Sequence, residues 1–156
     1  MSLLAVKDLS LTLGQPLFTD LSFSLAPGDR LALIAANGSG KSALLACLAG
    51  VLEPTSGTIT RARGLVLAPV PQDVPEALLP LTVTQAVASG LPKAVAEEES
   101  WRVDIALDDL AVPQDLRARP LADLSGGWQR MVLLARAAVA EPDLYLLDEP
   151  TNHLDL

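Results

Sequence analysis

The stretch IAANGSGKSALL, residues 34–45, decides which fold the chain can adopt. An unbroken apolar run covers residues 31–35 and suits a strand buried on both faces, and an apolar helix pattern covers residues 42–49. A glycine-rich loop between such a strand and helix aims several backbone N–H groups, and the positive end of the helix dipole, at one point. The stretch therefore predicts a phosphate-binding loop.

Two side chains of this loop have expected roles. Lys41 would reach the outer phosphates, and the hydroxyl of Ser42 would take a Mg²⁺ ligand position. A plain loop with a stray lysine is the alternative, because Gly-Lys-Ser is a weak signal by itself. Ala35 stands where such loops usually place their first glycine, which costs about 1 kcal/mol or more only if the position needs a positive φ. The expected binding residues of the loop are Asn37, Gly38, Ser39, Gly40, Lys41 and Ser42.

A second candidate region is LYLLDE, residues 144–149, where four apolar residues of a predicted buried strand precede two acids. In an open α/β sheet ligands lie beyond the carboxyl ends of the strands, so these acids and the Lys41 loop should share one crevice. Asp148 would hold Mg²⁺ through its water shell, and Glu149 could orient and deprotonate a water molecule in line with the terminal phosphate. Ordinary solvated acids at a strand end are the alternative.

The third region is LSGGW, residues 124–128, which precedes a predicted helix that runs to residue 140. Ser125 is its expected N-cap. Gly126 and Gly127 would let a ligand approach the backbone closely, which gives a second phosphate-binding point. A simple capped turn is the alternative.

Alternating and periodic patterns predict the remaining elements. Half-buried strands are expected at residues 9–13 and 21–25, and further strands at residues 57–60 and 65–70. Helices are expected at residues 83–89 and 94–110.

Composition limits the possible partners and the compartment. The chain has 156 residues, a net charge of −8 and a pI near 4.4, and it contains no run of Lys or Arg, which argues against tracking a nucleic-acid backbone. Its apolar runs are shorter than the roughly 20 residues that a membrane span needs. Cys47 is the single cysteine and the N-terminus lacks a signal-peptide pattern, so we expect a cytoplasmic location.

Taken in order, these motifs resemble those of the ATP-binding-cassette (ABC) ATPases. Residues 37–42 resemble the Walker A loop, residues 124–128 the signature motif, residues 144–149 the Walker B strand with its catalytic glutamate, and residues 150–155 the D-loop, which holds His153. Gln72 resembles the Q-loop glutamine, which implies a catalytic and Mg²⁺-binding role. The cofactors implied are ATP and Mg²⁺.

The resemblance implies an α/β P-loop NTPase fold with an N-terminal antiparallel β-subdomain and a short helical subdomain. Residues 1–72 would form the β-subdomain and Walker A core, residues 73–123 the helical subdomain, and residues 124–156 the signature, Walker B and D-loop. Because the family's sheet continues past this point, we expect an incomplete core sheet and no ATP turnover by this piece alone. Leu13 stands where the family usually places an aromatic residue that stacks on adenine.

Within the family, Trp128 and the string DEPTNHLD look most like the ABC-F group, which implies a second cassette and a ribosomal target contacted through other parts of the protein. In such pairs each signature, here Ser125 to Gly127, caps nucleotide held by the other cassette. Two alternatives stay open. One is the ATPase subunit of an ABC transporter, and the other is a nucleotide-binding module that does not hydrolyse ATP.

Overall fold

The chain forms two compact units, residues 1–67 and 68–156. The computed structural model describes residues 2–36 and 38–149, and all structural statements concern these residues. The N-terminal unit holds a three-stranded sheet and one helix. The C-terminal unit consists mainly of helices, with a pair of short strands. The ABC-type α/β fold expected from the motifs is confirmed.

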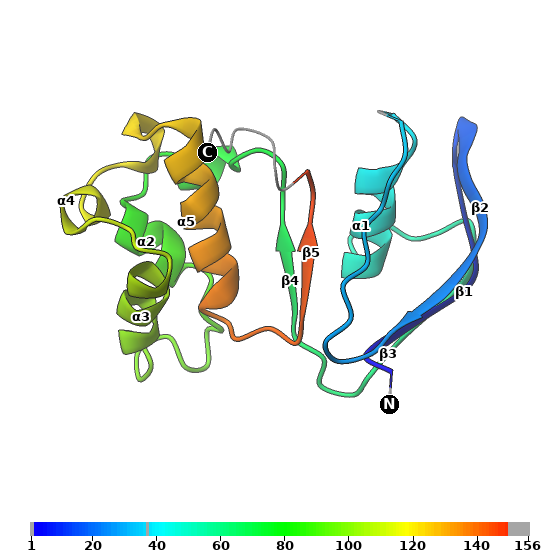
Figure 1. Ribbon diagram of the computed structural model, residues 1–156, viewed down its shortest axis with the longest axis horizontal. Coiled ribbons are helices and arrows are strands. Elements are labelled where there is room, and N and C mark those ends of the chain that lie inside the picture. Colours follow the sequence, from blue (N-terminus) through cyan, green and yellow to red (C-terminus); the bar gives the residue numbers. More distant parts are fainter. Residues whose placement is uncertain (1, 37, 150–156) are drawn as a thin grey trace. The chain divides into compact units, whose positions relative to one another are not determined.

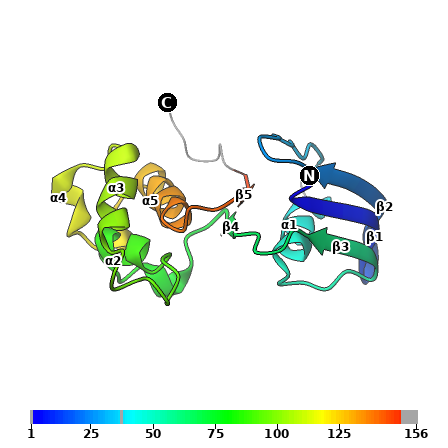
Figure 2. The same cartoon turned by 90° about the horizontal axis from the view of Figure 1, so that it is seen from below.

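The N-terminal sheet is antiparallel, with strand order β2-β1-β3 (Figures 1 and 2). Its strands are β1 (Leu4–Leu13), β2 (Gln15–Leu25) and β3 (Ser56–Arg61). Val6 of the central strand lies opposite Phe23 on one side and Ile59 on the other. Leu9 and Leu11 are fully buried, as their alternation with polar residues predicts. The expected antiparallel β-subdomain is thus confirmed.

Helix α1 (Lys41–Ala49) follows the glycine-rich loop and is fixed at its C-terminal end. Gly50 adopts φ 78° there, and its N–H donates to the carbonyl oxygens of Ala46 and Cys47. The guanidinium of Arg61, from β3, donates to the carbonyl oxygen of Leu48 at 2.9 Å and to that of Cys47 at 3.3 Å. These bonds satisfy the last carbonyls of the helix and attach it to the sheet.

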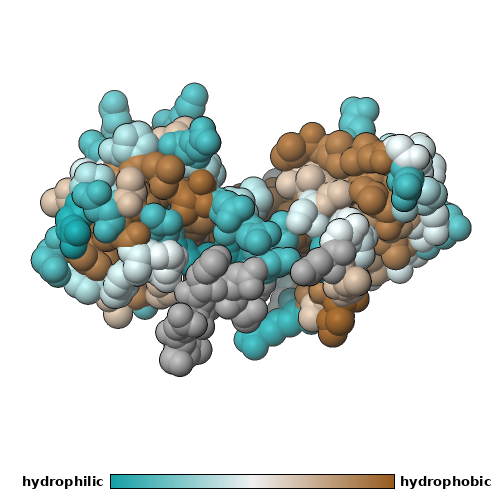
Figure 3. Space-filling view, turned by 90° about the horizontal axis from the view of Figure 1, so that it is seen from above, coloured by the Kyte–Doolittle hydropathy of each residue, from teal (hydrophilic) through white to brown (hydrophobic). Residues whose placement is uncertain are grey.

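The predicted buried strand at residues 31–35 is wrong. The structure assigns no strand there, and the side chains of Leu31 and Ile34 are 54% and 93% exposed. Figure 3 shows hydrophobic surface gathered on the N-terminal unit. A strand buried on both faces needs neighbours along its edges, and no described strand pairs with this run. The apolar pattern identifies a segment suited to a sheet interior, but it cannot supply the neighbouring strands.

The C-terminal unit packs helices around one hydrophobic core. Strands β4 (Leu67–Val70) and β5 (Leu144–Leu147) pair with each other, and Figure 1 draws both arrows toward the same end. The central helix α5 contacts both α2 and α3, and its Val132 and Ala135 are fully buried. The helices are η1 (Glu76–Leu78), α2 (Val83–Ala88), α3 (Trp101–Asp109), α4 (Gln114–Arg117), η2 (Leu121–Asp123) and α5 (Gly126–Ala138).

The helix predicted at residues 83–89 forms close to its expected bounds, whereas the helix predicted at residues 94–110 begins later than expected. Helix α2 begins at a capping box, in which the Thr82 hydroxyl accepts from the Gln85 N–H and the Gln85 side chain accepts from the Thr82 N–H. The helix predicted at residues 94–110 begins only at Trp101. From there, Val103, Ala106 and Leu107 reach the core at helical spacing, whereas residues 94–100 offer it only Ala96. Helix stability comes mainly from packing of an apolar face, so the earlier segment forms turns instead.

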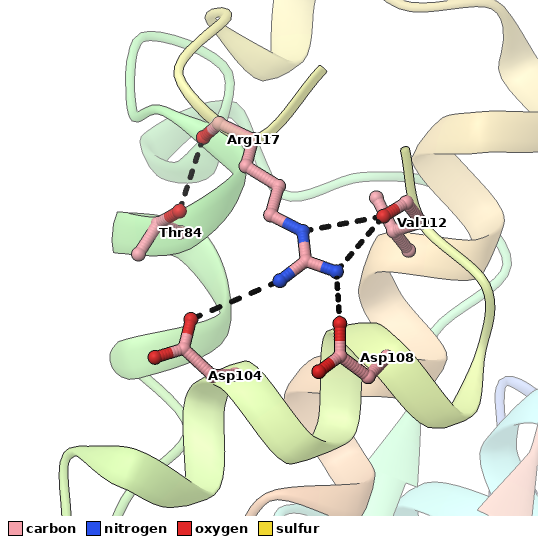
Figure 4. A network of polar contacts seen from close by, with 5 residues as sticks. All are labelled: Thr84, Asp104, Asp108, Val112 and Arg117. Atoms are coloured by element: carbon pink, nitrogen blue, oxygen red, sulfur yellow. Dashed lines mark hydrogen bonds and ion pairs between the residues drawn. The ribbon is translucent and has the colours of Figure 1, made fainter. Parts of the chain in front are cut away.

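A buried arginine ties three helices of this unit together (Figure 4). Arg117, at the end of α4, donates to the Asp108 carboxylate of α3 at 2.5 Å and to the carbonyl oxygen of Val112 at 3.0 Å. Its own carbonyl oxygen accepts a hydrogen bond from the Thr84 hydroxyl of α2 at 3.1 Å. The charge is therefore paired where it is buried, as stability requires.

The packing of α2 against α5 generates the first prediction. A Cβ atom added at Gly90 would lie 2.1 Å from the backbone oxygen of Arg136 in α5. Gly90→Ala should therefore lower the free energy of unfolding by about 1–3 kcal/mol, measured by urea denaturation. The exposed Lys93→Ala is the control and should stay within about 0.5 kcal/mol. Equal midpoints for the two variants would contradict the close backbone contact.

Candidate functional site

The glycine-rich loop leaves the start of α1 open to a ligand. Gly40 is the N-cap with φ 88°, and no side chain caps the helix. Gly38 also has a positive φ, 80°. The first-turn N–H groups of a helix have no partner within the helix, so here they remain available to an anion. The backbone thus has the conformation that a phosphate-binding loop needs, while Asn37 lies outside the described residues.

Lys41 lies over the loop rather than in solvent. Its ammonium donates to the carbonyl oxygens of Ala35 at 2.8 Å and Ala36 at 3.1 Å. Within the described residues the buried hydroxyl of Ser39 has no hydrogen-bond partner, which an incoming phosphate oxygen could provide. These groups fit an anionic ligand.

Alanine is tolerated at the position of the first Walker glycine. Ala35 is not among the described residues with a positive φ, so its Cβ carries no backbone penalty. Gly40 differs, because a Cβ there would also lie 2.9 Å from the Cβ of Leu17. Only one of these two positions requires glycine.

A cavity of about 190 Å³ adjoins the loop, and its lining includes a residue that the sequence patterns did not single out. Phe18 of β2 lines it together with Ser39, Gly40 and Lys41. Leu13, expected at the position of a base-stacking aromatic, is 57% exposed and does not line this cavity. The strands predicted at residues 9–13 and 21–25 leave Phe18 between them, and its place beside the loop depends on the pairing of β2 with β1.

The second candidate region lies where β4 and β5 end together. The N–H of Asp148 donates to the carbonyl oxygen of Val70 at 3.1 Å, so the acids that follow β5 adjoin the segment that leads to Gln72. The expected strand is present but only partly buried, because Leu146 is 5% exposed whereas Tyr145 and Leu147 are 43% and 39% exposed. A pair of strands leaves one face of each largely uncovered.

Glu149 has an unusual backbone conformation. Its φ is 44°, a left-handed value that costs a non-glycine residue of order 1–3 kcal/mol. Asp8, Asp20, Ala111 and Glu141 also have positive φ values, so this conformation does not by itself mark Glu149, and its catalytic role stays a prediction. The remaining D-loop residues and His153 lie outside the described part of the chain.

The signature turn forms the start of α5. Ser125 is its N-cap, and the Ser125 hydroxyl accepts from the N–H of Trp128 at 3.5 Å. Gly126 is exposed and Gly127 is half-buried, so a ligand can approach this turn. The expected N-cap is confirmed, whereas the expected contact with nucleotide of another cassette stays a prediction.

The oxygen donors predicted for a metal suit Mg²⁺. Ser42 of the N-terminal unit offers a hydroxyl, and Gln72 and Asp148 of the C-terminal unit offer an amide oxygen and a carboxylate. These are donor types that Mg²⁺ accepts beside phosphate oxygens and water, and their meeting on one ion stays a prediction. The described residues contain no cluster of three or more His, Cys, Asp or Glu side chains that could hold a metal by itself.

Cys47 carries no reactive role in this arrangement. Its side chain is 1% exposed in the apolar face of α1, and burial raises the pKa of the thiol. The thiol therefore stays protonated near neutral pH, and the thiolate is the nucleophilic form.

A protein-family model described as ABC transporter matches residues 18–152 of the chain. The zinc import ATP-binding protein ZnuC of Cereibacter sphaeroides is 41% identical over 157 residues, which cover 99% of this chain and 62% of the relative. The protein of the same name from Roseobacter denitrificans is also 41% identical, over 99% of this chain and 59% of the relative. The chain thus spans about three fifths of these relatives' length.

Solved structures agree with these relatives. A structure described as an inward-facing conformation of a metal-chelate type ABC transporter is 33% identical, with a TM-score of 0.80, over 99% of this chain and 62% of that one. A nucleotide-free ATP-binding cassette from an ABC transporter, 22% identical over 99% of this chain and 72% of that one, matches the fold with a TM-score of 0.83. Among the described residues no helix is long and apolar enough to cross a membrane.

The expectation of an ABC-F protein is not supported by these relatives, which are ATP-binding proteins of import systems. The transporter alternative fits them better. Trp128, which favoured the ABC-F group, packs against the hydrophobic core of the C-terminal unit. An aromatic residue at this position therefore has a local packing role that does not depend on the cellular target.

The site geometry generates a prediction for Lys41. Lys41→Ala should weaken ATP binding by about 1.5–3 kcal/mol, because a charge-assisted contact to the phosphates is lost. Titration calorimetry with Mg-ATP measures the change. The control is Lys7→Ala, which removes an exposed lysine of the same unit and should leave the affinity unchanged. If Lys41→Ala also left it unchanged, the loop would not be the phosphate site.

Proposed function

The chain belongs to the ABC transporter family, and we propose that it forms the nucleotide-binding part of a metal-ion importer that is driven by Mg-ATP hydrolysis. The observation that carries the proposal is the uncapped N-terminus of α1, with Gly40 in a left-handed conformation and Lys41 held over the loop. The 41% identity to proteins named for zinc import supports a zinc or related divalent cation as cargo.

In this proposal Lys41 and the loop N–H groups bind the phosphates of ATP. Bound Mg²⁺ would neutralise part of their charge, with Ser42, Gln72 and Asp148 as its oxygen donors. Glu149 accepts a proton from a water molecule whose oxygen attacks the terminal phosphorus. The bond from that phosphorus to the bridging oxygen breaks, and the products are ADP and inorganic phosphate.

A second cassette completes the site in this proposal. Ser125, Gly126 and Gly127 present an accessible helix N-terminus at the start of α5. We infer that this turn contacts ATP held by a partner cassette, and that a membrane permease is the further partner of the pair. The name of the structure with 33% identity, a metal-chelate type transporter, supports such an assembly.

The whole protein tests this function when it is reconstituted in vesicles with its permease. ATP turnover should rise with the permease present, and radioactive zinc should cross the membrane only with ATP. Turnover that responds to added ribosomes and not to the permease would contradict the importer proposal. Zinc-independent transport of another divalent cation would correct the cargo alone.

Glu149→Gln should keep ATP binding and lose steady turnover by about 10²–10⁴-fold, because the amide cannot accept the proton from water. Phosphate release and calorimetry on the whole protein measure the two properties. Glu98→Gln removes an exposed carboxylate and is the control. Normal turnover by Glu149→Gln would exclude this residue as general base, and absent turnover by the unaltered protein would favour a module that only binds nucleotide.

Ser125→Arg tests the contact in trans. The larger side chain should block closure against a partner cassette, so turnover should vanish while each cassette binds ATP with unchanged affinity. Ser100→Arg, at an exposed position before α3, is the control and should turn over ATP normally. Weaker ATP binding by the isolated Ser125→Arg cassette would show that the turn serves its own site instead.

A further inference from the structure

Arg130 is a buried arginine that connects three segments of the C-terminal unit. It lies in α5, close to the Ser125 N-cap, and its side chain is 4% exposed. Within the described residues its guanidinium donates to the carbonyl oxygen of Pro71, to that of Gln72 at 3.1 Å, and to that of Asp148 at 2.6 Å. The signature helix is thus bonded to both the Gln72 segment and the end of β5.

Burying the charge of Arg130 costs free energy of desolvation. Arg130 buries its charge against carbonyl oxygens, and its buried Nε has no partner in the described part of the chain. Replacing a buried charge and its partners by apolar groups is often neutral or stabilising. Arg117 differs, because its charge faces the carboxylate of Asp108 at 2.5 Å. The acceptors of Arg130 are backbone carbonyl oxygens, which no substitution removes, so its bonds both stabilise the unit and fix the position of these segments.

The hydrogen-bond acceptors of Arg130 indicate which segments it positions. Gln72 and Asp148 are the two residues of this unit that we expect to act on the metal, and one planar guanidinium bonds the backbone of both. Gln72 and Asp73 also line a cavity of about 150 Å³ beside Gln129 and Arg130. A segment that borders a cavity is held more by its hydrogen bonds than by close packing.

We propose that Arg130 is a positioning residue that sets the distance between Gln72 and Asp148 and links both to the signature turn at Ser125. This rests on the proposed function, since it concerns the metal and water of that site. Because the guanidinium is rigid and planar, a shift of α5 moves both carbonyl contacts together. Contact of the signature turn with nucleotide on a partner cassette would thereby reach the metal ligands through a single side chain.

Three variants of the whole protein test the proposal. Arg130→Met keeps the length and apolar packing of the side chain but removes all three bonds. Arg130→Lys keeps the charge and can make only part of them. Arg117→Met is the matched control, because it removes a buried arginine of the same unit whose bonds go to Asp108 and Val112 instead.

Three measurements apply to each variant: the melting temperature, the Mg²⁺ concentration that gives half-maximal turnover, and Mn²⁺ binding in the presence of ADP by electron paramagnetic resonance. Arg130→Met should melt at a lower temperature than the unaltered protein, because the carbonyl oxygens of Pro71, Gln72 and Asp148 lose their donor. It should need about 10- to 100-fold more Mg²⁺ and bind Mn²⁺ correspondingly less tightly, because residues that orient metal ligands typically have effects of this size. Arg130→Lys should lie between the two.

The control should differ from Arg130→Met in its response to metal. Arg117→Met should melt at a lower temperature and keep the Mg²⁺ and Mn²⁺ responses of the unaltered protein. The proposal is overturned if Arg130→Met responds to both metals normally, or if its melting temperature falls as far as that of Arg117→Met with no change in metal response. If the unaltered protein has no turnover, the proposed hydrolysis fails, while the Mn²⁺ titration still decides the role of Arg130.

Discussion

The start of α1 is a helix N-terminus without a side-chain cap, and the candidate site depends on this single feature. Gly40 is the N-cap, and a Cβ there would meet Leu17, so no serine or aspartate can take the position and satisfy the first N–H groups. Arg61 and Gly50 hold the other end of the helix. The helix is therefore secured at its C-terminus and open at its N-terminus, which suits a fixed support for a charged ligand.

In the C-terminal unit the proposed functional residues come from distant parts of the sequence, so the fold must bring them together. Gln72 follows one short strand and Asp148 follows another, and the pairing of β4 with β5 brings them to one edge. Helix α5 then adds the signature turn. The two buried arginines connect different elements. Arg117 joins helices to each other, while Arg130 joins helix α5 to the segments that hold Gln72 and Asp148, the proposed metal ligands.

Local chemistry was predictable from the sequence where it depends on neighbouring residues. The N-cap at Ser125 and the glycine turn at residue 40 follow from residues within three positions. The capping box at Thr82 has the same local basis, although the sequence patterns did not single it out. The prediction of a buried strand at residues 31–35 was wrong, because such a strand needs neighbouring strands and a local sequence pattern does not show whether they are present. Helix α3 begins later than predicted for a related reason. Packing against the hydrophobic core, rather than the apolar pattern by itself, determines which residues become helical.

Arg130 and Phe18 are two residues of the candidate site whose positions local sequence patterns could not predict. An arginine in an amphipathic helix usually lies on its solvated face, and only the folded unit brings three carbonyl oxygens to this one. The choice between ABC-F protein and transporter ATPase failed differently. It rested on Trp128 and on the string DEPTNHLD; the packing of Trp128 against the core is compatible with either target, and residues 150–155 of the string lie outside the described part of the chain.

The close approach of Gly90 to α5 has a consequence for how this sequence can diverge. The nearest atom to a Cβ at position 90 belongs to the backbone of residue 136, so the constraint on Gly90 persists whatever side chain position 136 carries. In the described part of the chain the guanidinium of Arg136 donates a hydrogen bond to the Ser89 hydroxyl at 3.0 Å. During evolution residues 89 and 136 can change as a pair, while residue 90 is restricted to glycine for as long as α2 and α5 keep this spacing.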